Sequence, residues 1–460
     1  MKPDPDIFRE YDIRGIVQTQ LTDDLAYHLG RAIGTTVRRG GGKTVAVGCD
    51  CRKSGQRLSR ALIRGLNQTG CDAVFIGDTP TPVGYWAIQH LKADGGVQIT
   101  GSHNPPEYNG FKITLLGRSL HGPDIQNLRK LIEHEDYEKG QGQSEDRPLL
   151  NAYIDELAKN LRPAKRKLTV VVDAGNGTGG ITAVPLYKKL GYNVIELFCD
   201  MDGNFPNHHP DPTVEENIAD LKRAIKEHKA DIGLAFDGDA DRVGVVDSDG
   251  QVIWGDKLMI LLSRAVLKEK PGAAIIGEVK CSKTMYDDIT AHGGRAIMWR
   301  TGHSLIKAKM KEEKAELAGE MSGHIFFKHR YYGFDDGVYA GGRLLELLSE
   351  QPEPLSQLLA GVPHTVATPE IRFDCPDAIK FELVKRAIAH FKAQAKAENY
   401  RVLDIDGARV EWADGWGLVR CSNTQPILVM RFEAQTQQRL DAIEKTFNEV
   451  IGRLKSELSR

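Results

Sequence analysis

The sequence predicts an α/β fold with three similar α/β domains in tandem, each with a mixed sheet, and a C-terminal α+β domain. The chain has 460 residues, and a prior of roughly 150 residues per domain gives about three or four domains. Short β-branched runs alternate with helical spacing in three successive rounds, which is typical of parallel or mixed sheets covered by helices. The last part of the chain instead combines hairpin signals with two long helices.

The first round covers residues 1–148. A helix is expected at 59–70, because its apolar residues have helical spacing and Gly70 is a typical stop signal. Strands rich in β-branched residues are expected on both sides of it, at 44–48, 73–76 and 96–100. The polar segment 138–147 is interpreted as the linker that ends this domain.

The next two rounds are expected at 149–250 and 251–363. In the second round the same reasoning predicts strands at 168–172, 193–197 and 231–236. Helices are expected between them, at 181–190 and 214–228. The third round begins near Val252. It is expected to contain a helix at 256–268, a strand at 273–276 and a second helix at 304–312.

The fourth domain, residues 364–460, has a different pattern. A long helix is expected at 377–397, and an amphipathic helix at 438–455 ends the chain. The strands between them are expected at 401–405, 408–412, 416–420 and 427–433. Two Asp-Gly pairs join these runs as in β-hairpins, so an α+β domain results.

Composition and charge argue against several classes of function. The net charge of −2 and the pI near 6.7 give no basic excess for a nucleic-acid partner. No signal-peptide-like run and no stretch of about 20 apolar residues is present, so neither secretion nor a membrane span is expected. The seven cysteines contain no C-x-x-C pair and are interpreted as reduced thiols of a cytoplasmic protein.

The most informative segment is an acidic loop. Asp237, Asp239 and Asp241 are two residues apart, so an extended backbone sends all three carboxylates to one side. Because their charges repel, a cation is expected between them, and hard oxygen ligands favour magnesium, manganese or calcium. A calcium EF-hand is excluded, because Arg242 and Ser248 replace the required Gly and Glu. Arg242 beside the carboxylates fits an anionic ligand such as phosphate.

Three further polar loops are candidate site elements. Ser102 and His103 lie in loop 100–110, directly after a predicted buried strand, where α/β folds usually place their sites. A serine that only caps a turn is the alternative. Residues 319–324 place a carboxylate, a hydroxyl and an imidazole between glycines, a set that can bind sugar hydroxyls. Residues 420–426 join an arginine to small polar side chains, which suits a phosphate dianion, although a polar β-turn is an alternative.

One motif favours a different class of enzyme. Residues 175–180 fit G-x-G-x-x-G after a predicted strand and before a predicted helix, and Glu196 stands at the end of the next strand. This pattern is typical of dinucleotide binding, so an NAD-dependent oxidoreductase is an alternative function. Tight packing between strand and helix explains the glycines equally well, and the motif accounts for neither the acidic loop nor residues 420–424.

In their order along the chain, these loops resemble the α-D-phosphohexomutase superfamily, and in particular its bacterial phosphomannomutase/phosphoglucomutase branch. The resemblance covers essentially the whole chain. It rests on the segments at 11–15, 100–110, 237–242, 320–324 and 420–424. It implies four domains arranged around a central active-site cleft.

The resemblance also implies roles for individual residues. Ser102 is expected to be the phosphoserine that donates and recovers the phosphoryl group, and to join Asp237, Asp239 and Asp241 around Mg²⁺. Lys112 and His303 are expected to transfer protons. The substrate-binding residues implied in the same way are Tyr11, Arg14, Arg242, Lys280, Gly302, His303, Glu320, Ser322, His324, Arg420, Ser422, Asn423 and Thr424.

The implied reaction interconverts hexose 1-phosphates and hexose 6-phosphates of mannose and glucose, through phospho-Ser102 and a 1,6-bisphosphate that reorients in the site. Mg²⁺ is the implied cofactor and glucose 1,6-bisphosphate or mannose 1,6-bisphosphate the activator. Phosphosugars are the expected partners of a cytoplasmic monomer. A phosphoglucosamine mutase is the alternative within the superfamily, but Met321 favours the mannose/glucose branch because the glucosamine branch more often has Gln there.

Overall fold

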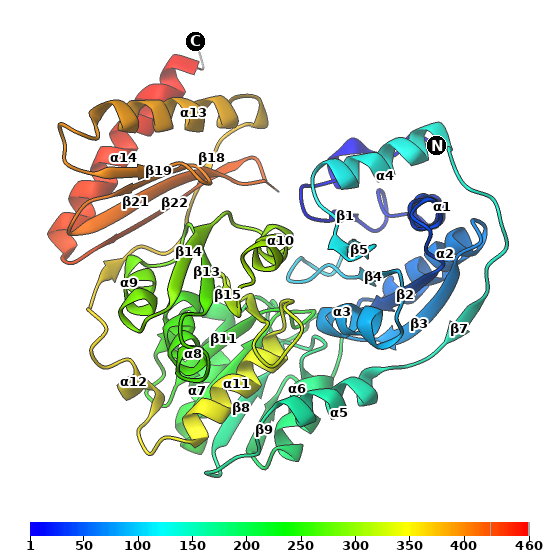
Figure 1. Ribbon diagram of the computed structural model, residues 1–460, viewed down its shortest axis with the longest axis horizontal. Coiled ribbons are helices and arrows are strands. Elements are labelled where there is room, and N and C mark those ends of the chain that lie inside the picture. Colours follow the sequence, from blue (N-terminus) through cyan, green and yellow to red (C-terminus); the bar gives the residue numbers. More distant parts are fainter. Residues whose placement is uncertain (424, 459–460) are drawn as a thin grey trace.

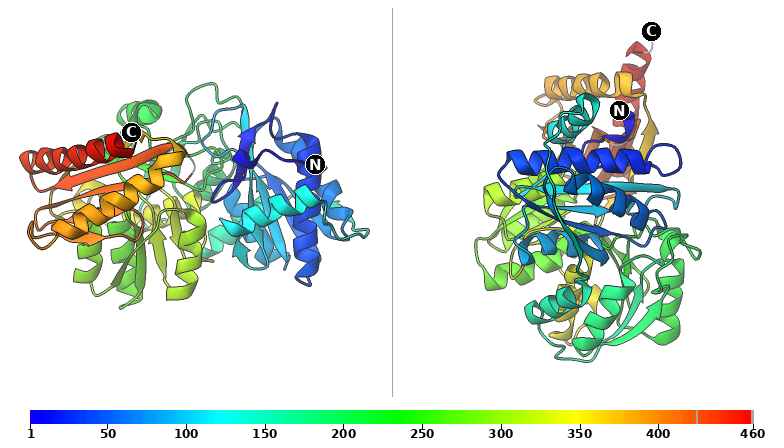
Figure 2. Two further views of the ribbon diagram at one scale, coloured as in Figure 1. Left: turned by 90° about the horizontal axis from the view of Figure 1, so that it is seen from above. Right: turned by 90° about the vertical axis from the view of Figure 1, so that its right-hand side faces the viewer.

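The computed structural model describes residues 1–423 and 425–458 (Figure 1). Its strands form four sheets, each from a successive part of the sequence. The N-terminal part (blue) and the C-terminal part (orange and red) lie on opposite sides of the green and yellow middle part (Figures 1 and 2). The first three sheets mix parallel and antiparallel pairs, and in the fourth every named pair is antiparallel. The predicted fold class is therefore confirmed.

The first sheet has the strand order β1-β5-β4-β2-β3-β7, with β6 beside β5. Its centre is covered on both faces, because β4 (Gly95–Ile99) is buried along its whole length and β2 (Thr44–Cys49) everywhere except Thr44. The other elements of this part are β1 (Ile13–Ile16), β3 (Asp72–Asp78), β5 (Tyr108–Leu115), β6 (Arg118–Ser119), β7 (Ser144–Asp146), α1 (Asp23–Arg39), α2 (Gly55–Asn67), α3 (Thr81–His90) and α4 (Pro123–His134).

The segment 138–147, interpreted as a linker, contains the edge strand β7. This strand runs parallel to β3, with Ser144 opposite Ala73 and Asp146 opposite Phe75. Its three side chains are polar and exposed, so no apolar alternation marked it in the sequence. Charged edges of this kind protect a sheet from pairing with another chain.

The second and third sheets have the strand orders β12-β11-β10-β8-β9 and β14-β13-β15-β16. The elements of the second are β8 (Thr169–Asp173), β9 (Asn193–Leu197), β10 (Ile232–Phe236), β11 (Val243–Asp247), β12 (Val252–Ile253), α5 (Leu150–Asn160), α6 (Gly180–Lys189) and α7 (Ala219–His228). Those of the third are β13 (Ala274–Glu278), β14 (Arg295–Trp299), β15 (Leu317–Gly319), β16 (Ile325–Phe327), α8 (Gly255–Glu269), α9 (Lys283–Ala291), α10 (His303–Glu313), α11 (Gly337–Ser349) and α12 (Leu355–Leu358).

One hydrophobic core joins the second and third sheets. It contains Leu234 of β10, Leu317 of β15 and Leu344 of α11, all fully buried. Helix α11 follows the third sheet in sequence but also packs on β10 and β11. Strand β12 completes the second sheet although it lies after the expected boundary at 250. The three boundaries between the four domains stay predictions.

The fourth sheet has the order β17-β22-β21-β20-β19, with β18 beside β22, and a hydrophobic core of its own. Both long helices pack on it. Its elements are β17 (Val366–Ala367), β18 (Ile371–Asp374), β19 (Arg401–Leu403), β20 (Ala408–Glu411), β21 (Gly415–Cys421), β22 (Ile427–Ala434), α13 (Asp377–Gln394) and α14 (Gln437–Leu458). Among the described helices, none combines the length and the apolar character needed to cross a bilayer.

The fourth domain meets the third through buried charges. Arg409 of β20 is fully buried and donates to the carbonyl oxygens of Val279 at 2.6 Å and Cys281 at 2.7 Å. Arg431 of β22 pairs with Asp256 of α8 at 3.0 Å. Because such contacts need defined geometry, they fix the orientation of the fourth sheet more closely than apolar packing alone.

Replacing Arg431 by methionine should loosen this interface. The change leaves the buried carboxylate of Asp256 without its cation, at a cost of roughly 3–5 kcal/mol. We expect faster amide exchange in β21 and β22, measured by hydrogen-exchange mass spectrometry. Arg401→Met is the control, because Arg401 is exposed and its pair with Glu411 contributes about 1 kcal/mol or less. Equal exchange in the two variants would contradict this description of the interface.

Candidate active site

Several of the predicted site residues of the three α/β domains lie just after the carboxyl ends of strands. Ser102 follows β4 and Asp237 follows β10. The strands β13, β14 and β15 are parallel neighbours; the loops after β13 and β15 carry Lys280 and Glu320, and His303 begins α10 after the loop that follows β14. In α/β folds these strand ends face the ligand. The fold therefore directs the loops of all three domains toward a common region.

Ser102 has a left-handed backbone conformation, with a φ of 47°. Its Oγ donates a hydrogen bond to Oδ2 of Asp237 at 2.7 Å, although the two residues are 135 positions apart. Gly238 permits this approach, because a Cβ atom there would lie 2.4 Å from the carbonyl oxygen of Ser102. The serine loop and the acidic loop therefore form one site.

The serine loop is held by Arg52, which the sequence reasoning did not select. Its buried guanidinium is paired with Asp50 at 3.2 Å. It donates to four carbonyl oxygens of the loop, those of Ser102 (2.8 Å), Asn104 (2.5 Å), Pro105 (2.6 Å) and Tyr108 (2.9 Å). One cation thus satisfies acceptors that would be costly to bury alone. An Asp-x-Arg sequence directly after a strand was the available signal.

The three aspartates are fully buried and close together. One oxygen from each lies within 4.8 Å of the other two. Lys112 of β5 donates to Asp239 at 2.7 Å and also pairs with Asp241. With Nε of Arg242 at 3.9 Å from Oδ2 of Asp237, two cationic side chains face three carboxylates, which leaves their charge unbalanced. Burial and the charges of Asp239 and Asp241 therefore raise the pKa of Asp237 well above its usual value.

This cluster fits a hard divalent cation. Oδ1 of Asp239 and Oδ1 of Asp241 are buried and have no hydrogen-bond partner among the described residues. Unpaired buried carboxylate oxygens are costly, and a set of oxygen ligands suits Mg²⁺ or Ca²⁺ rather than zinc. The donor set therefore meets the requirements of the metal site that the sequence predicts.

Two histidines lie next to the acidic loop. Arg242 donates from Nε to Nε2 of His324 at 2.9 Å. Because arginine only donates, the proton of His324 lies on Nδ1, which is 3.2 Å from Oδ2 of Asp335. The ring of His303 stacks near that of His324, with centroids 6.0 Å apart. Burial and the ammonium group of Lys307 lower the pKa of His303, which favours the neutral imidazole.

Tyr11 of the first domain touches both the third and the fourth. Its hydroxyl donates to the carbonyl oxygen of Thr301 at 2.9 Å and accepts from Nδ2 of Asn423 at 2.5 Å. Burial raises the pKa of Tyr11 to about 12, so the hydroxyl keeps its proton. Nearby in the sequence, Arg14 donates to Oδ1 of Asn104 in the serine loop at 2.9 Å.

The third domain contributes the carboxylate of Glu320, which lies next to the N-terminus of α10. Glu320 accepts a hydrogen bond from the backbone nitrogen of Gly302 at 2.7 Å and another from Oγ of Ser322 at 3.2 Å. The side chain is buried. These contacts fix the carboxylate at the carboxyl end of β15.

The fourth domain adds the loop after β21. Arg420 is buried and pairs with Asp406 at 3.0 Å, and Asp406 also accepts from the backbone nitrogen of Thr301 at 3.1 Å. Ser422 is buried at the same loop and accepts from the backbone nitrogen of Gln425. Thr424, also predicted as a substrate-binding residue, lies outside the described residues.

Lys280, predicted as a substrate-binding residue, is paired with a carboxylate of the fourth domain. Its ammonium group lies 2.9 Å from the carboxylate of Glu370, which stands between β17 and β18 of the fourth sheet. Asp335, Asp406 and Glu370 were missed because nothing local in the sequence links them to their partners, which are His324, Arg420 and Lys280.

The G-x-G-x-x-G segment is packed against protein. A Cβ atom at Gly177 would lie 2.7 Å from the carbonyl oxygen of Gly238, and one at Gly180 would lie 2.2 Å from that of Cys199. The backbone nitrogen of Thr178 donates to the Gly238 carbonyl at 3.0 Å. The glycines therefore allow close strand–helix packing behind the acidic loop. This explains the motif without a dinucleotide.

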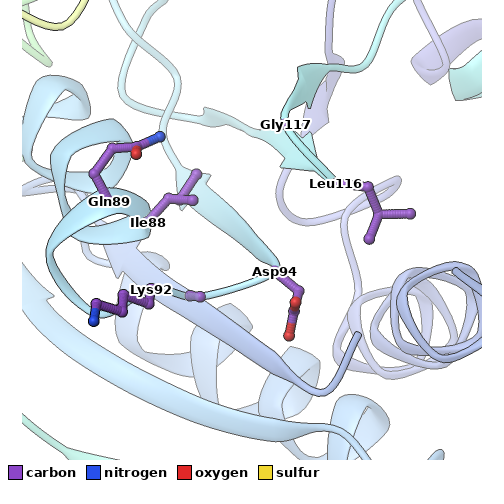
Figure 3. A pocket seen from close by; sticks show the side chains of 7 residues that line it. Ile88, Gln89, Lys92, Asp94, Leu116 and Gly117 are labelled. Atoms are coloured by element: carbon purple, nitrogen blue, oxygen red, sulfur yellow. The ribbon is translucent and has the colours of Figure 1, made fainter. Parts of the chain in front are cut away.

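A surface hollow of about 370 Å³ lies at the end of β4 opposite Ser102 (Figure 3). Its lining includes Lys92, Asp94 and Leu116. The carboxylate of Asp94 already accepts hydrogen bonds from the backbone nitrogens of residues 43 and 44, so it stabilises the start of β2. The hollow is separate from the converging loops.

Sequence models of one family match almost the whole chain. They are described as phosphoglucomutase/phosphomannomutase alpha/beta/alpha domains I, II and III and C-terminal domain, and match residues 5–139, 151–250, 254–366 and 370–450. The chain belongs to the phosphoglucomutase/phosphomannomutase family. The predicted relationship to the α-D-phosphohexomutase superfamily is thereby confirmed.

Relatives in this family are similar over nearly their full length. The phosphomannomutase/phosphoglucomutase of Pseudomonas putida is 48% identical, with 98% of this chain and 96% of the relative covered. The phosphoglucomutase of Neisseria gonorrhoeae is 47% identical, with 97% and 96% covered. A crystal structure of a phosphoglucomutase/phosphomannomutase family protein from Burkholderia thailandensis has a TM-score of 0.92 at 44% identity, with 98% of each chain covered.

Replacing Arg52 by lysine should loosen the serine loop selectively. Lysine keeps the charge but lacks the planar fork that reaches several carbonyls. Each buried acceptor left unpaired costs about 1–3 kcal/mol, so amide exchange in residues 101–108 should accelerate on the order of 10- to 100-fold. Arg60→Lys, at an exposed arginine paired with Asp146, should leave this loop unchanged. Unaltered protection of residues 101–108 in the Arg52 variant would contradict its assigned role.

Proposed function

We propose that the protein interconverts the 1-phosphates and 6-phosphates of glucose and mannose, with Ser102 as the residue that carries the phosphoryl group. Its near full-length relatives at 46–48% identity are named phosphomannomutase/phosphoglucomutase or phosphoglucomutase. The observation that carries the proposal is the hydroxyl of Ser102 at 2.7 Å from Asp237, within a buried acidic cluster that fits a metal. A phosphoryl group on this oxygen would sit where cationic groups converge.

Mg²⁺ would be held by Asp237, Asp239 and Asp241, with an oxygen of phospho-Ser102 as a further ligand. When bound, the ion would offset the negative charge of the transferring phosphoryl group. Lys112, which is shared between two of the aspartates, adds a second positive charge at the same place. This arrangement supports stabilisation by charge, which phosphoryl transfer needs more than covalent chemistry.

The proton of the attacking sugar hydroxyl must leave as the phosphoryl group arrives. His303 suits this task better than Lys112, because its imidazole is neutral and Lys112 is committed to two carboxylates. Transfer from Ser102 to O6 of a hexose 1-phosphate gives a 1,6-bisphosphate and frees the serine oxygen. Return of the other phosphoryl group to Ser102 leaves a hexose 6-phosphate. Glucose 1,6-bisphosphate or mannose 1,6-bisphosphate would activate the enzyme by phosphorylating Ser102.

The bisphosphate must reorient, so the remaining contacts have to accept both ends of the sugar. Arg420 with Ser422, Asn423 and Thr424 would hold the phosphate that is not reacting. Glu320 and Ser322 would bind hydroxyl groups that occupy similar places in both orientations. Contacts to O3 and O4 meet this requirement and ignore C2, where glucose and mannose differ. Tyr11, Arg14, Arg242, Gly302 and His324 would line the same site.

The direct test is the Ser102→Ala variant assayed with glucose 1-phosphate and mannose 1-phosphate in the presence of Mg²⁺ and glucose 1,6-bisphosphate. We expect activity of the unaltered protein on both sugars. The variant should lose it by a factor on the order of 10⁴ or more, together with the phosphoprotein detected by intact mass. Ser144→Ala, at an exposed position of β7, is the control. Near-normal turnover in the Ser102 variant would exclude the phosphoserine, and activity on one sugar alone would exclude dual specificity.

A further inference from the structure

An ion pair joins the candidate site to a residue near the start of the fourth domain. Nζ of Lys280 donates to Oε2 of Glu370 at 2.9 Å. Lys280 is 6% exposed and lies on the loop after β13, whereas Glu370 directly precedes β18. Because β18 pairs with β22, Glu370 is fixed to the fourth sheet. The pair therefore spans two domains.

Lys280 is surrounded by residues of the site. Burial disfavours its charge, but the carboxylates of Glu370 and Glu278 outweigh this and raise the pKa of Lys280. Arg420 and Glu320 also act on it electrostatically, so Lys280 lies near both the loop after β21 and the loop after β15. An ammonium group in this place is suited to bind the phosphate of a phosphosugar.

The two carboxylates next to Lys280, those of Glu278 and Glu370, differ in how many other hydrogen bonds hold them. Glu278 is fully buried and accepts hydrogen bonds from the backbone nitrogens of Lys280 and Met321 and from Oγ1 of Thr301. These contacts fix it as part of the loop structure. Glu278 is therefore unable to leave without breaking the loop.

Glu370 has a second cationic partner besides Lys280. Its side chain is 22% exposed, and its second oxygen accepts from Nε of Arg372 at 3.2 Å. The side chain of Arg372 is 59% exposed. If the Lys280 contact breaks, the carboxylate keeps a cationic partner and gains water. Release of Glu370 therefore costs less than release of a fully buried carboxylate.

We propose that Glu370 is an internal competitor of the substrate phosphate for Lys280: the carboxylate holds the ammonium group between catalytic events, and the phosphate displaces it. This inference rests on the proposed phosphosugar mutase function. A phosphate dianion attracts the ammonium more strongly than a single carboxylate, so the exchange is favourable. It also releases one tether between the third and fourth domains when phosphate arrives.

Competition of this kind weakens substrate binding and at the same time speeds release. Tight binding of the ground state would lower KM but would not raise kcat. The bisphosphate must release its phosphate contacts in order to reorient in the site. A carboxylate that pairs with Lys280 as the phosphate leaves makes this release faster. Glu370 thus acts through Lys280 and is a positioning residue rather than a catalytic one.

The test is Glu370→Gln, which removes the charge and keeps the shape. We expect KM for glucose 1-phosphate and the inhibition constant of inorganic phosphate to fall roughly three- to tenfold, with a lower kcat. Glu370→Asp, which is one methylene shorter, should shift both constants in the same direction by less. Glu398→Gln, an exposed glutamate of the same domain, is the control for the change in net charge.

The direction of the change separates the outcomes. A purely structural role of the ion pair predicts a higher or unchanged KM in both Glu370 variants, and that result would overturn the proposal. In a Lys280→Met background, Glu370→Gln should have no further effect on KM, and a persisting decrease would also overturn it. If the unaltered protein shows no mutase activity on either sugar, the proposed function fails instead, independently of Glu370.

Discussion

The charge balance around three buried aspartates is the constraint on which the rest of the site depends. Asp237, Asp239 and Asp241 are removed from water, and Lys112 offsets only part of their charge. Burying carboxylates in this way is unfavourable unless cations and hydrogen-bond donors surround them. The fold supplies some of these donors from another domain, such as the hydroxyl of Ser102. The remaining negative charge makes the cluster suited to a metal ion.

Precise placement of the serine follows from a second buried charge. Arg52 neutralises Asp50 and ties four carbonyl oxygens of the serine loop to one guanidinium. Gly238 leaves room for the loop to approach the acidic cluster. Side chains from the carboxyl ends of the other parallel strands then face the same region, and Tyr11 links them to the fourth domain.

Much of this arrangement could be predicted from the sequence. The alternation of strands and helices gave the fold class, since apolar periodicity reports burial directly. Asp237 to Asp241 and Ser102 were recognisable because their spacing and their position after buried strands are local features. Arg52 and Glu370 were not, because their partners are 50 and 90 positions away in the chain. The polar edge strand β7 was missed for a different reason, since nothing in its exposed side chains marks a strand.

The central claim is that the acidic loop is one half of a metal site and that the phosphate on Ser102 is the other half. Calorimetric titration of Mg²⁺ into the phosphorylated and dephosphorylated protein tests it most directly, with the phosphorylation state checked by intact mass. The phosphorylated form should bind Mg²⁺ on the order of tenfold more tightly, because it adds a charged oxygen ligand. Asp239→Asn should weaken binding in both forms. Equal affinity of the two forms, or binding that survives the Asp239 change, would contradict the account.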